Sequence, residues 1–196
     1  MLPILAQMCA YLYTELRGKT MTANVYTSIS SQTLTSNAAT LSLNSFSGYT
    51  DLRIVLSQVT TGQSNTNLVF NGVASDYAQF TWYGFGTTNG GGSNLWYTSG
   101  ALGLVYLYGD RAQNGNTYPG TTIIDIPYYA RTETNHMLAV ETGIILGGAS
   151  ANSYARDVST SQWANTSAIT SIAINCGNGQ SFAVGTVVSL YGITEQ

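Results

Sequence analysis

Asp51-Leu52-Arg53-Ile54-Val55-Leu56-Ser57 carries the clearest structural pattern of this sequence. Leu52, Ile54 and Leu56 alternate with polar residues, and Val55 is the one apolar residue that is out of phase. A period of two is typical of a β-strand with one buried face. Strand patterns rich in Ile, Val, Thr and Tyr also occur at residues 39–44, 102–108, 121–126, 168–175 and 184–193. The chain is therefore predicted to be all-β.

Glycine-containing turns separate these predicted strands. Examples are Thr61-Gly62, Asn71-Gly72, Pro119-Gly120 and Gly147-Gly148. Short strands joined by such turns favour a β-sandwich, here predicted to hold about 8–10 antiparallel strands in one domain over residues 21–196. The longest irregular stretch, residues 84–94, is predicted to be a surface loop near a subunit contact.

Residues 1–20 differ in composition from the rest of the chain and are predicted to form an N-terminal arm. Pro3 and Gly18 suit the first turn of a helix and the position just past its end, which predicts a short α-helix over residues 3–17. Apolar residues recur within it at helical spacing. Those expected to bind a partner are Ile4, Leu5, Met8, Tyr11 and Leu12. Met21, where the composition changes, is an alternative start.

Charged residues are unusually scarce. They make up 8% of the 196 residues, compared with about 25% in average soluble proteins. The net charge is −3, and no basic residue occurs between Arg53 and Arg111. Nucleic-acid binding needs clustered Lys and Arg, so nucleic acid is excluded as a partner. The longest apolar stretches, residues 2–13 and 137–149, are too short for a membrane span, so no membrane partner is expected.

Few residues are available for catalysis or metal binding. His136 is the only histidine, and it is predicted to be a loop or strand-edge residue beside Glu133. Cys9 and Cys176 lack the spacing of a metal site and are predicted to be unpaired thiols. Asp125 lies inside a predicted strand, where we expect it to face solvent or a subunit contact. We therefore predict no enzymatic activity, no metal and no cofactor.

Adjacent aromatic residues suggest a binding surface. The pairs are Trp82-Tyr83, Trp96-Tyr97 and Tyr128-Tyr129, and Trp163 stands alone. Neighbours in a strand point to opposite faces, so one ring of each pair is expected in the core and the other outside. An outward ring can contact a glycan or another subunit. The sequence leaves both uses open, and with them a lectin or a carbohydrate-active enzyme that uses two carboxylates.

Further segments, in order along residues 24–193, carry a resemblance to a known family. They are Tyr26-Thr27-Ser28-Ile29-Ser30-Ser31-Gln32-Thr33-Leu34, Tyr49-Thr50-Asp51-Leu52, Phe70-Asn71-Gly72, Ser75-Asp76-Tyr77, Ile124-Asp125-Ile126-Pro127-Tyr128-Tyr129, Trp163, Ala168-Ile169-Thr170-Ser171-Ile172, Phe182-Ala183-Val184-Gly185-Thr186 and Ser189-Leu190-Tyr191-Gly192-Ile193. In this order they resemble a family of small virion structural proteins of tailed bacteriophages and prophages, with a jelly-roll-like β-sandwich. The resemblance implies a particle component of the head surface or tail without a catalytic site. Residues 1–20 lie outside the shared pattern.

A capsid decoration (cement) protein is the first expectation. Short uncharged side chains have little charge to desolvate and lose little conformational entropy when subunits pack. We expect a homotrimer that binds the major capsid protein on the outer surface of the virion, after assembly in the cytoplasm of the bacterial host. The alternative is a tail or fibre component that binds a host glycan. The number of copies per particle distinguishes the two, because it is high for a decoration protein and low for a tail tip.

Overall fold

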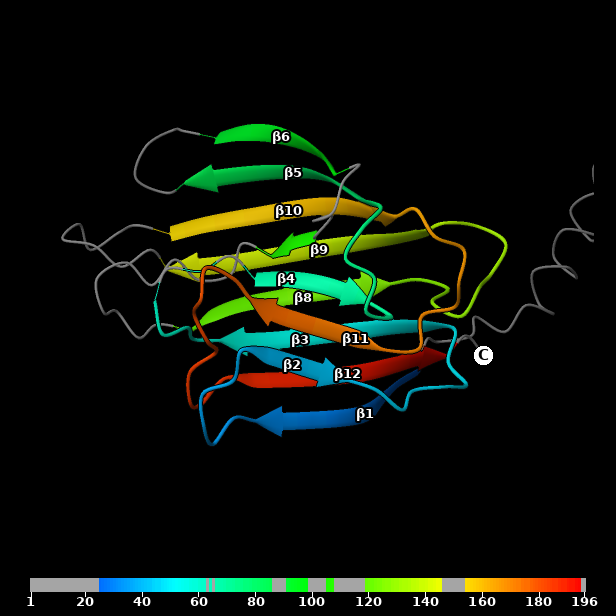
Figure 1. Ribbon diagram of the computed structural model, residues 1–196, viewed down its shortest axis with the longest axis horizontal. Helices are drawn as coiled ribbons and strands as arrows, with labels where there is room; N and C mark the ends of the chain where they lie inside the picture. The colour runs from blue at the N-terminus through cyan, green and yellow to red at the C-terminus, as the bar shows by residue number, and fades with distance from the viewer. Residues whose placement is uncertain are drawn as a thin grey trace, which may run out of the picture.

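The computed structural model describes residues 25–62, 64, 66–85, 91–98, 105–107, 119–145 and 154–194. Within these residues there are twelve β-strands and no helix (Figure 1). The strands are β1 (Val25–Thr33), β2 (Thr40–Leu43), β3 (Asp51–Gln58), β4 (Thr66–Phe70), β5 (Tyr77–Phe85), β6 (Gly91–Thr98), β7 (Val105–Leu107), β8 (Gly120–Ile126), β9 (His136–Ile145), β10 (Tyr154–Trp163), β11 (Ile172–Cys176) and β12 (Val187–Thr194). The all-β prediction is confirmed. The helix predicted over residues 3–17, with its five partner-binding residues, lies outside the described residues.

The strands form two antiparallel sheets. The larger has eight strands in the order β1-β12-β3-β8-β9-β10-β5-β6, and the smaller has four in the order β2-β11-β4-β7. Figure 1 shows the smaller sheet in front of β8, β3 and β12 of the larger one, so the two make a sandwich-like pair of layers. In the part of the chain that the structure describes, no helix is long and apolar enough to cross a membrane.

The alternation in β3 places its apolar side chains between the sheets. Leu52, Ile54 and Leu56 are fully buried, whereas Val55 lies on the opposite face and is only half-buried. β3 pairs with β12 on one side and with β8 on the other, so its apolar face lies near the middle of the core. The core residues on the strands are Leu41, Leu43, Leu52, Ile54, Leu56, Leu68, Phe70, Tyr77, Ile124, Ile126, Leu138, Val140, Trp163, Ile172, Ile174, Val188 and Leu190.

An aromatic cluster closes one end of this core and corrects the prediction for His136. His136 is the first residue of β9 and is only 3% exposed, so it is not an exposed loop or strand-edge residue. Its ring stacks on Trp163 with a centroid distance of 5.6 Å, and its Nε2 lies 2.9 Å from the carbonyl oxygen of Ser167. Trp163 also stacks on Tyr77 at 6.1 Å. Trp163 is the residue paired with His136 across β9 and β10, so strand pairing brings the two rings together and buries His136 in the core.

The loop predicted over residues 84–94 is wrong at both of its ends, which lie in strands, while residues 86–90 lie outside the described residues. Gly84 pairs with Gly91, and the register continues to Tyr77 opposite Thr98, so β5 and β6 form a hairpin. Glycines at residues 84 and 91–92 gave a loop signal in the sequence, although they occupy strand positions here. The described residues hold twelve strands rather than the predicted 8–10, and β5 and β6 are two of those that the patterns missed.

The predicted strand at residues 168–175 begins later, at Ile172. Residues 168–171 are held instead by the side chain of Asn71, which follows β4. Its Oδ1 accepts hydrogen bonds from the backbone N–H groups of Thr170 (2.8 Å) and Ser171 (3.1 Å), and its Nδ2 donates to the carbonyl of Ala168 (2.8 Å). Bonds to one side chain replace the pairing that a strand would need, which keeps this segment irregular.

Candidate interaction surface

The side of the eight-stranded sheet that points away from the four-stranded sheet, called the outer face below, collects residues from most of the chain. The ladder places Arg53 opposite Asp125, Asp125 opposite Ala139, Ala139 opposite Thr160 and Thr160 opposite Phe80. Directly paired residues project to the same face of a sheet. These five residues therefore form one row across β3, β8, β9, β10 and β5.

Phe80, Trp82 and Val158 form an exposed apolar cluster on the outer face, called the aromatic patch. They are 46%, 68% and 50% exposed. Trp82 is directly paired with Val158 across β5 and β10. Trp82 is thus an outward ring, as expected for one member of its pair in the sequence, whereas the side chain of Tyr83 lies outside the described ones. Large apolar side chains grouped on a protein surface mark sites of contact with other molecules.

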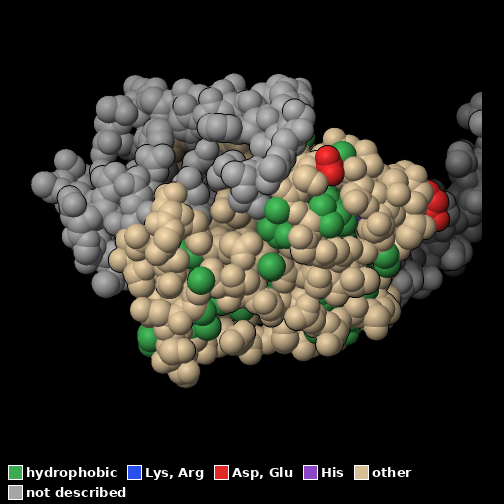
Figure 2. All heavy atoms as spheres, viewed as in Figure 1, with side chains coloured by type: hydrophobic (Ala, Val, Ile, Leu, Met, Phe, Trp, Pro, Cys, Tyr) green, Lys and Arg blue, Asp and Glu red, His purple; other side chains and the backbone are tan. Residues whose placement is uncertain are grey.

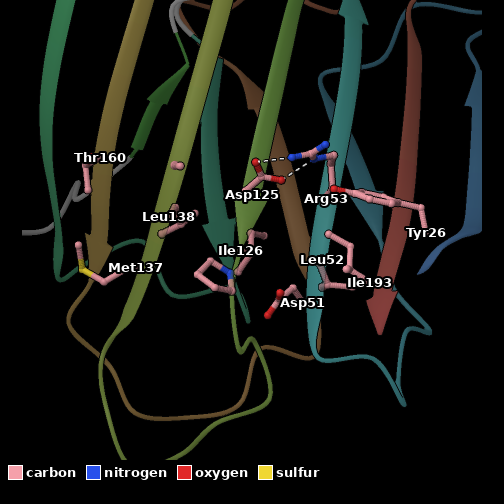
Figure 3. Close-up of a pocket in the computed structure, with 12 residues that line it drawn as sticks. Tyr26, Asp51, Leu52, Arg53, Asp125, Ile126, Met137, Leu138, Thr160 and Ile193 are labelled. Atoms are coloured by element: carbon pink, nitrogen blue, oxygen red, sulfur yellow. Dashed lines mark hydrogen bonds and ion pairs between the residues drawn. The ribbon is translucent and has the colours of Figure 1, made fainter. Parts of the chain in front are cut away.

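A shallow groove of about 390 Å³ crosses the outer face at the end where β3 begins and β8 ends (Figure 3). It runs from Tyr26 of β1 past β12, β3, β8 and β9 to Thr160 of β10. Much of its lining is apolar, with Pro127, Met137 and Ile193 among the contributors. Met137 is 46% exposed and Tyr26 is 50% exposed, so apolar groups in the groove remain in contact with solvent.

An ion pair lies along one side of this groove. Arg53 Nε donates to Asp125 Oδ1 at 2.5 Å, and Nη2 donates to Oδ2 at 2.8 Å (Figure 3). The guanidinium carbon also lies 5.2 Å from the centroid of the Tyr26 ring. The hydrogen bond to Asp125 raises the pKa of Arg53, against the opposing effect of burial. The pair therefore presents little net charge, and it links β3 to β8 and to the first strand.

A second ion pair lies beside the aromatic patch. Arg156 of β10 donates through Nη2 to Glu141 of β9. Glu141 is directly paired with Val158, a member of the patch. Both charged side chains are more than half exposed, so the pair contributes little to stability. It does place a hydrogen-bond donor and acceptor beside the aromatic patch.

The opposite side of the molecule differs from the outer face in the kinds of side chain that it exposes. Figure 2 shows the face over the four-stranded sheet, where backbone and uncharged polar side chains dominate among the described residues. Apolar side chains are scattered there, and acidic ones are visible at two places. Phe80, Trp82, Met137 and Val158, the exposed large apolar residues of the central strands, lie instead on the outer face.

The prediction for the Tyr128-Tyr129 pair is confirmed, and the prediction for the Trp96-Tyr97 pair cannot be tested. Tyr128 is 41% exposed and Tyr129 is 3% exposed, so one ring of this pair is outside and the other is in the core. Trp163 is fully buried. Asp125 lies on the outer face as predicted, although its partner is Arg53. The side chains of Trp96 and Tyr97 lie outside the described ones.

The structure describes only one of the two cysteines and only part of the possible metal ligands. Cys176 Sγ donates to Ser64 Oγ at 3.1 Å, while Cys9 lies outside the described residues. Among the residues that the structure describes, no group of three or more His, Cys, Asp or Glu side chains is arranged to hold a metal ion.

The groove is the feature that the sequence did not predict. Its lining comes from six strands whose order in the sheet differs from their order in the chain. The sequence alone indicates only the alternation of side chains within a strand. Comparison of the chain with protein-family models, with curated proteins and with solved structures gives no match. The geometry of the outer face is therefore the basis for any functional assignment, together with the resemblance in the sequence.

Proposed function

We propose that this chain is a structural protein of a phage particle that decorates the outer surface of the capsid, and that the aromatic patch is its contact with the major capsid protein. The observation that carries this proposal is the exposure of Trp82, Phe80 and Val158 on a regular antiparallel sheet. The order of segments that resembles the phage family supports the choice of a phage particle. The jelly-roll-like relation of the sheets, the homotrimer and the assembly in the host cytoplasm belong to the same proposal.

Binding through the aromatic patch should cost little conformational entropy. Trp82 and Phe80 stand on a strand held by neighbours on both sides, so the backbone loses little freedom when a partner covers them. Aromatic side chains near the centre of an interface supply much of its binding free energy. Among the described residues, the charges beside them are those of the Arg156–Glu141 pair, and these can stay at the rim in contact with water.

The test uses particles of the phage or prophage that encodes this chain. The number of copies per particle is measured by quantitative mass spectrometry, and binding of added protein to particles lacking it is measured by co-sedimentation. A decoration protein is expected in high copy number, and the free protein is expected to have three times the 20.8 kDa of one chain by light scattering. Trp82→Ser is expected to weaken binding by about 30-fold, as for a central aromatic residue worth about 2 kcal/mol.

Val184→Ser is the matched control, because Val184 is 58% exposed and lies before β12, away from the patch. It should leave binding unchanged. A handful of copies per particle, or equal binding by the two variants, would contradict the proposal.

A second candidate function is glycan binding by a tail or fibre component. The observation that favours it is the position of the Arg156–Glu141 pair beside Val158 and Trp82, because a ring with neighbouring donors and acceptors suits a sugar. A glycan array probed with the purified protein tests it. Binding to a defined glycan that Trp82→Ser abolishes, with Val184→Ser unaffected, would favour this function over capsid decoration.

A further inference from the structure

We propose that the groove on the outer face is the binding site for the N-terminal segment of the same chain, residues 1–20, which lays the apolar side of a helix over residues 3–17 across the sheet. This concerns the single chain and goes beyond the proposed function. It gives Ile4, Leu5, Met8, Tyr11 and Leu12 an intramolecular partner, in place of the external partner expected from the sequence.

The described chain begins at one end of the groove. Val25 is the first residue of β1, and Tyr26, the next, lines one end of the groove. The preceding residues are therefore tethered at the groove itself. A tethered segment competes with any free partner at an effective concentration of about a millimolar.

The groove and the predicted helix have similar lengths. The groove spans β1, β12, β3, β8, β9 and β10, and five strand spacings correspond to about 24 Å. A helix over residues 3–17 has a length of about 22 Å. Residues 18–24 then connect its end to Val25, and seven extended residues reach about 23 Å, more than a turn at the edge of the sheet needs.

The side chains that line the groove also suit the predicted helix. The predicted helix has an apolar side that is unstable in water unless it is covered. The groove offers apolar side chains, with Met137 and Tyr26 half exposed, and two carboxylates, of which Asp125 is paired with Arg53. Asp51 accepts a hydrogen bond from the backbone N–H of Tyr128 and forms no ion pair with a described residue.

These features set the direction of the segment. Chain continuity places the end of the helix near β1, which brings Arg17 and Lys19 towards Asp51. The beginning of the helix then lies over β9 and β10. Leu5 is about 18 Å from residue 17 along the helix, and β9 is about 19 Å from β1, so Leu5 falls beside Met137.

Disulfide trapping tests this arrangement in the full chain. Cys9 and Cys176 are replaced by Ser, and Leu5→Cys is combined with Met137→Cys in one protein and with Val184→Cys in a control. Both partner positions are exposed apolar residues of the described structure, so both proteins should keep the far-UV circular dichroism of the parent. An added oxidant, copper phenanthroline, accepts the two electrons when the two thiols join and release their protons. Products are separated on non-reducing gels and identified by intact mass.

We expect a disulfide within one chain, formed roughly tenfold faster for Leu5/Met137 than for Leu5/Val184, because the docked segment holds the first pair close together. Equal rates in the two proteins would overturn the inference. A covalent dimer as the main product of Leu5/Met137 would also overturn it, because the segment would then come from another copy. Particle binding is measured separately through Trp82, which is not a groove residue, so this inference and the proposed function can fail independently.

Discussion

A side chain at Gly192 of β12 should destabilise the fold, because the ring of Tyr49 occupies the space. Gly192 is paired with Thr27 of β1 and Leu52 of β3, and it faces the core. A Cβ built there falls on Cγ and Cδ1 of Tyr49, well inside the 3.0 Å that real Cβ contacts essentially never show. Tyr49 itself packs against the hydrophobic core, so the ring cannot swing into open solvent without losing burial.

The expected cost of Gly192→Ala follows from two opposing effects. Moving the ring by about 1 Å in a packed core costs about 1–3 kcal/mol, while alanine in place of glycine in a strand gains about 0.5–1 kcal/mol. The net loss in the free energy of unfolding is about 1–2 kcal/mol, or a fall in Tm of roughly 2–8 °C for a chain of this size. Chemical denaturation gives the first quantity, and calorimetry gives the second.

Gly143→Ala is the matched control, because Gly143 also lies in a strand and a Cβ there meets nothing within 4 Å. It should be neutral or slightly stabilising. In a Tyr49→Ala background, Gly192→Ala should lose its cost, since the overlapping ring is gone. If Gly192→Ala is as stable as Gly143→Ala, or if its cost persists without the Tyr49 ring, the steric reasoning is refuted.

Three further substitutions test individual contacts. Burial raises the pKa of Tyr77 to about 12 from 10.0, so the folded chain holds this proton more tightly than the unfolded chain does. The free energy of unfolding should therefore fall as pH rises between these two values, and Tyr77→Phe should remove this part of the pH dependence in a series of denaturation measurements. Arg53→Met should lower stability by less than about 1 kcal/mol, since both members of its ion pair are about a third exposed, and the loss should shrink at high salt; a larger, salt-independent loss would indicate a packing role instead. Asn71→Ala should cost about 1–3 kcal/mol by denaturation because its side chain holds residues 168–171. Asn178→Ala is the control for placing alanine at a positive φ, because φ is 56° at Asn178 and 53° at Asn71. An equal cost for the two substitutions would mean that the hydrogen bonds of Asn71 contribute nothing.

The local patterns of the sequence were sufficient for the fold class. Side-chain alternation is a property of a single strand, so Leu52, Ile54 and Leu56 could be assigned to the core without knowledge of their neighbours. The same holds for residues 121–126, which correspond to β8. One member of the Tyr128-Tyr129 pair was expected outside, and Tyr128 is exposed while Tyr129 is buried.

The structural roles of individual glycines and of His136 could not be predicted from the sequence, because neighbouring residues do not show whether such a residue lies in a loop or in a strand. A glycine fits both a loop and the strands of a hairpin, and only the pairing of Gly84 with Gly91 places these residues in β5 and β6. A single histidine carries no periodicity. The burial of His136 depends on the ring of Trp163, which reaches it through the pairing of β9 with β10.

The outer face was decided by tertiary structure alone. The sequence determined which side chains of a strand share a face, because successive residues alternate. It did not determine which strands become neighbours, because pairing depends on hydrogen bonds between segments far apart in the chain. Tyr26 and Thr160 line one groove only because six strands from β1 to β10 lie in the order that places them there. Trp82 meets Val158 for the same reason, so the surface proposed to bind a partner exists only in the folded sheet.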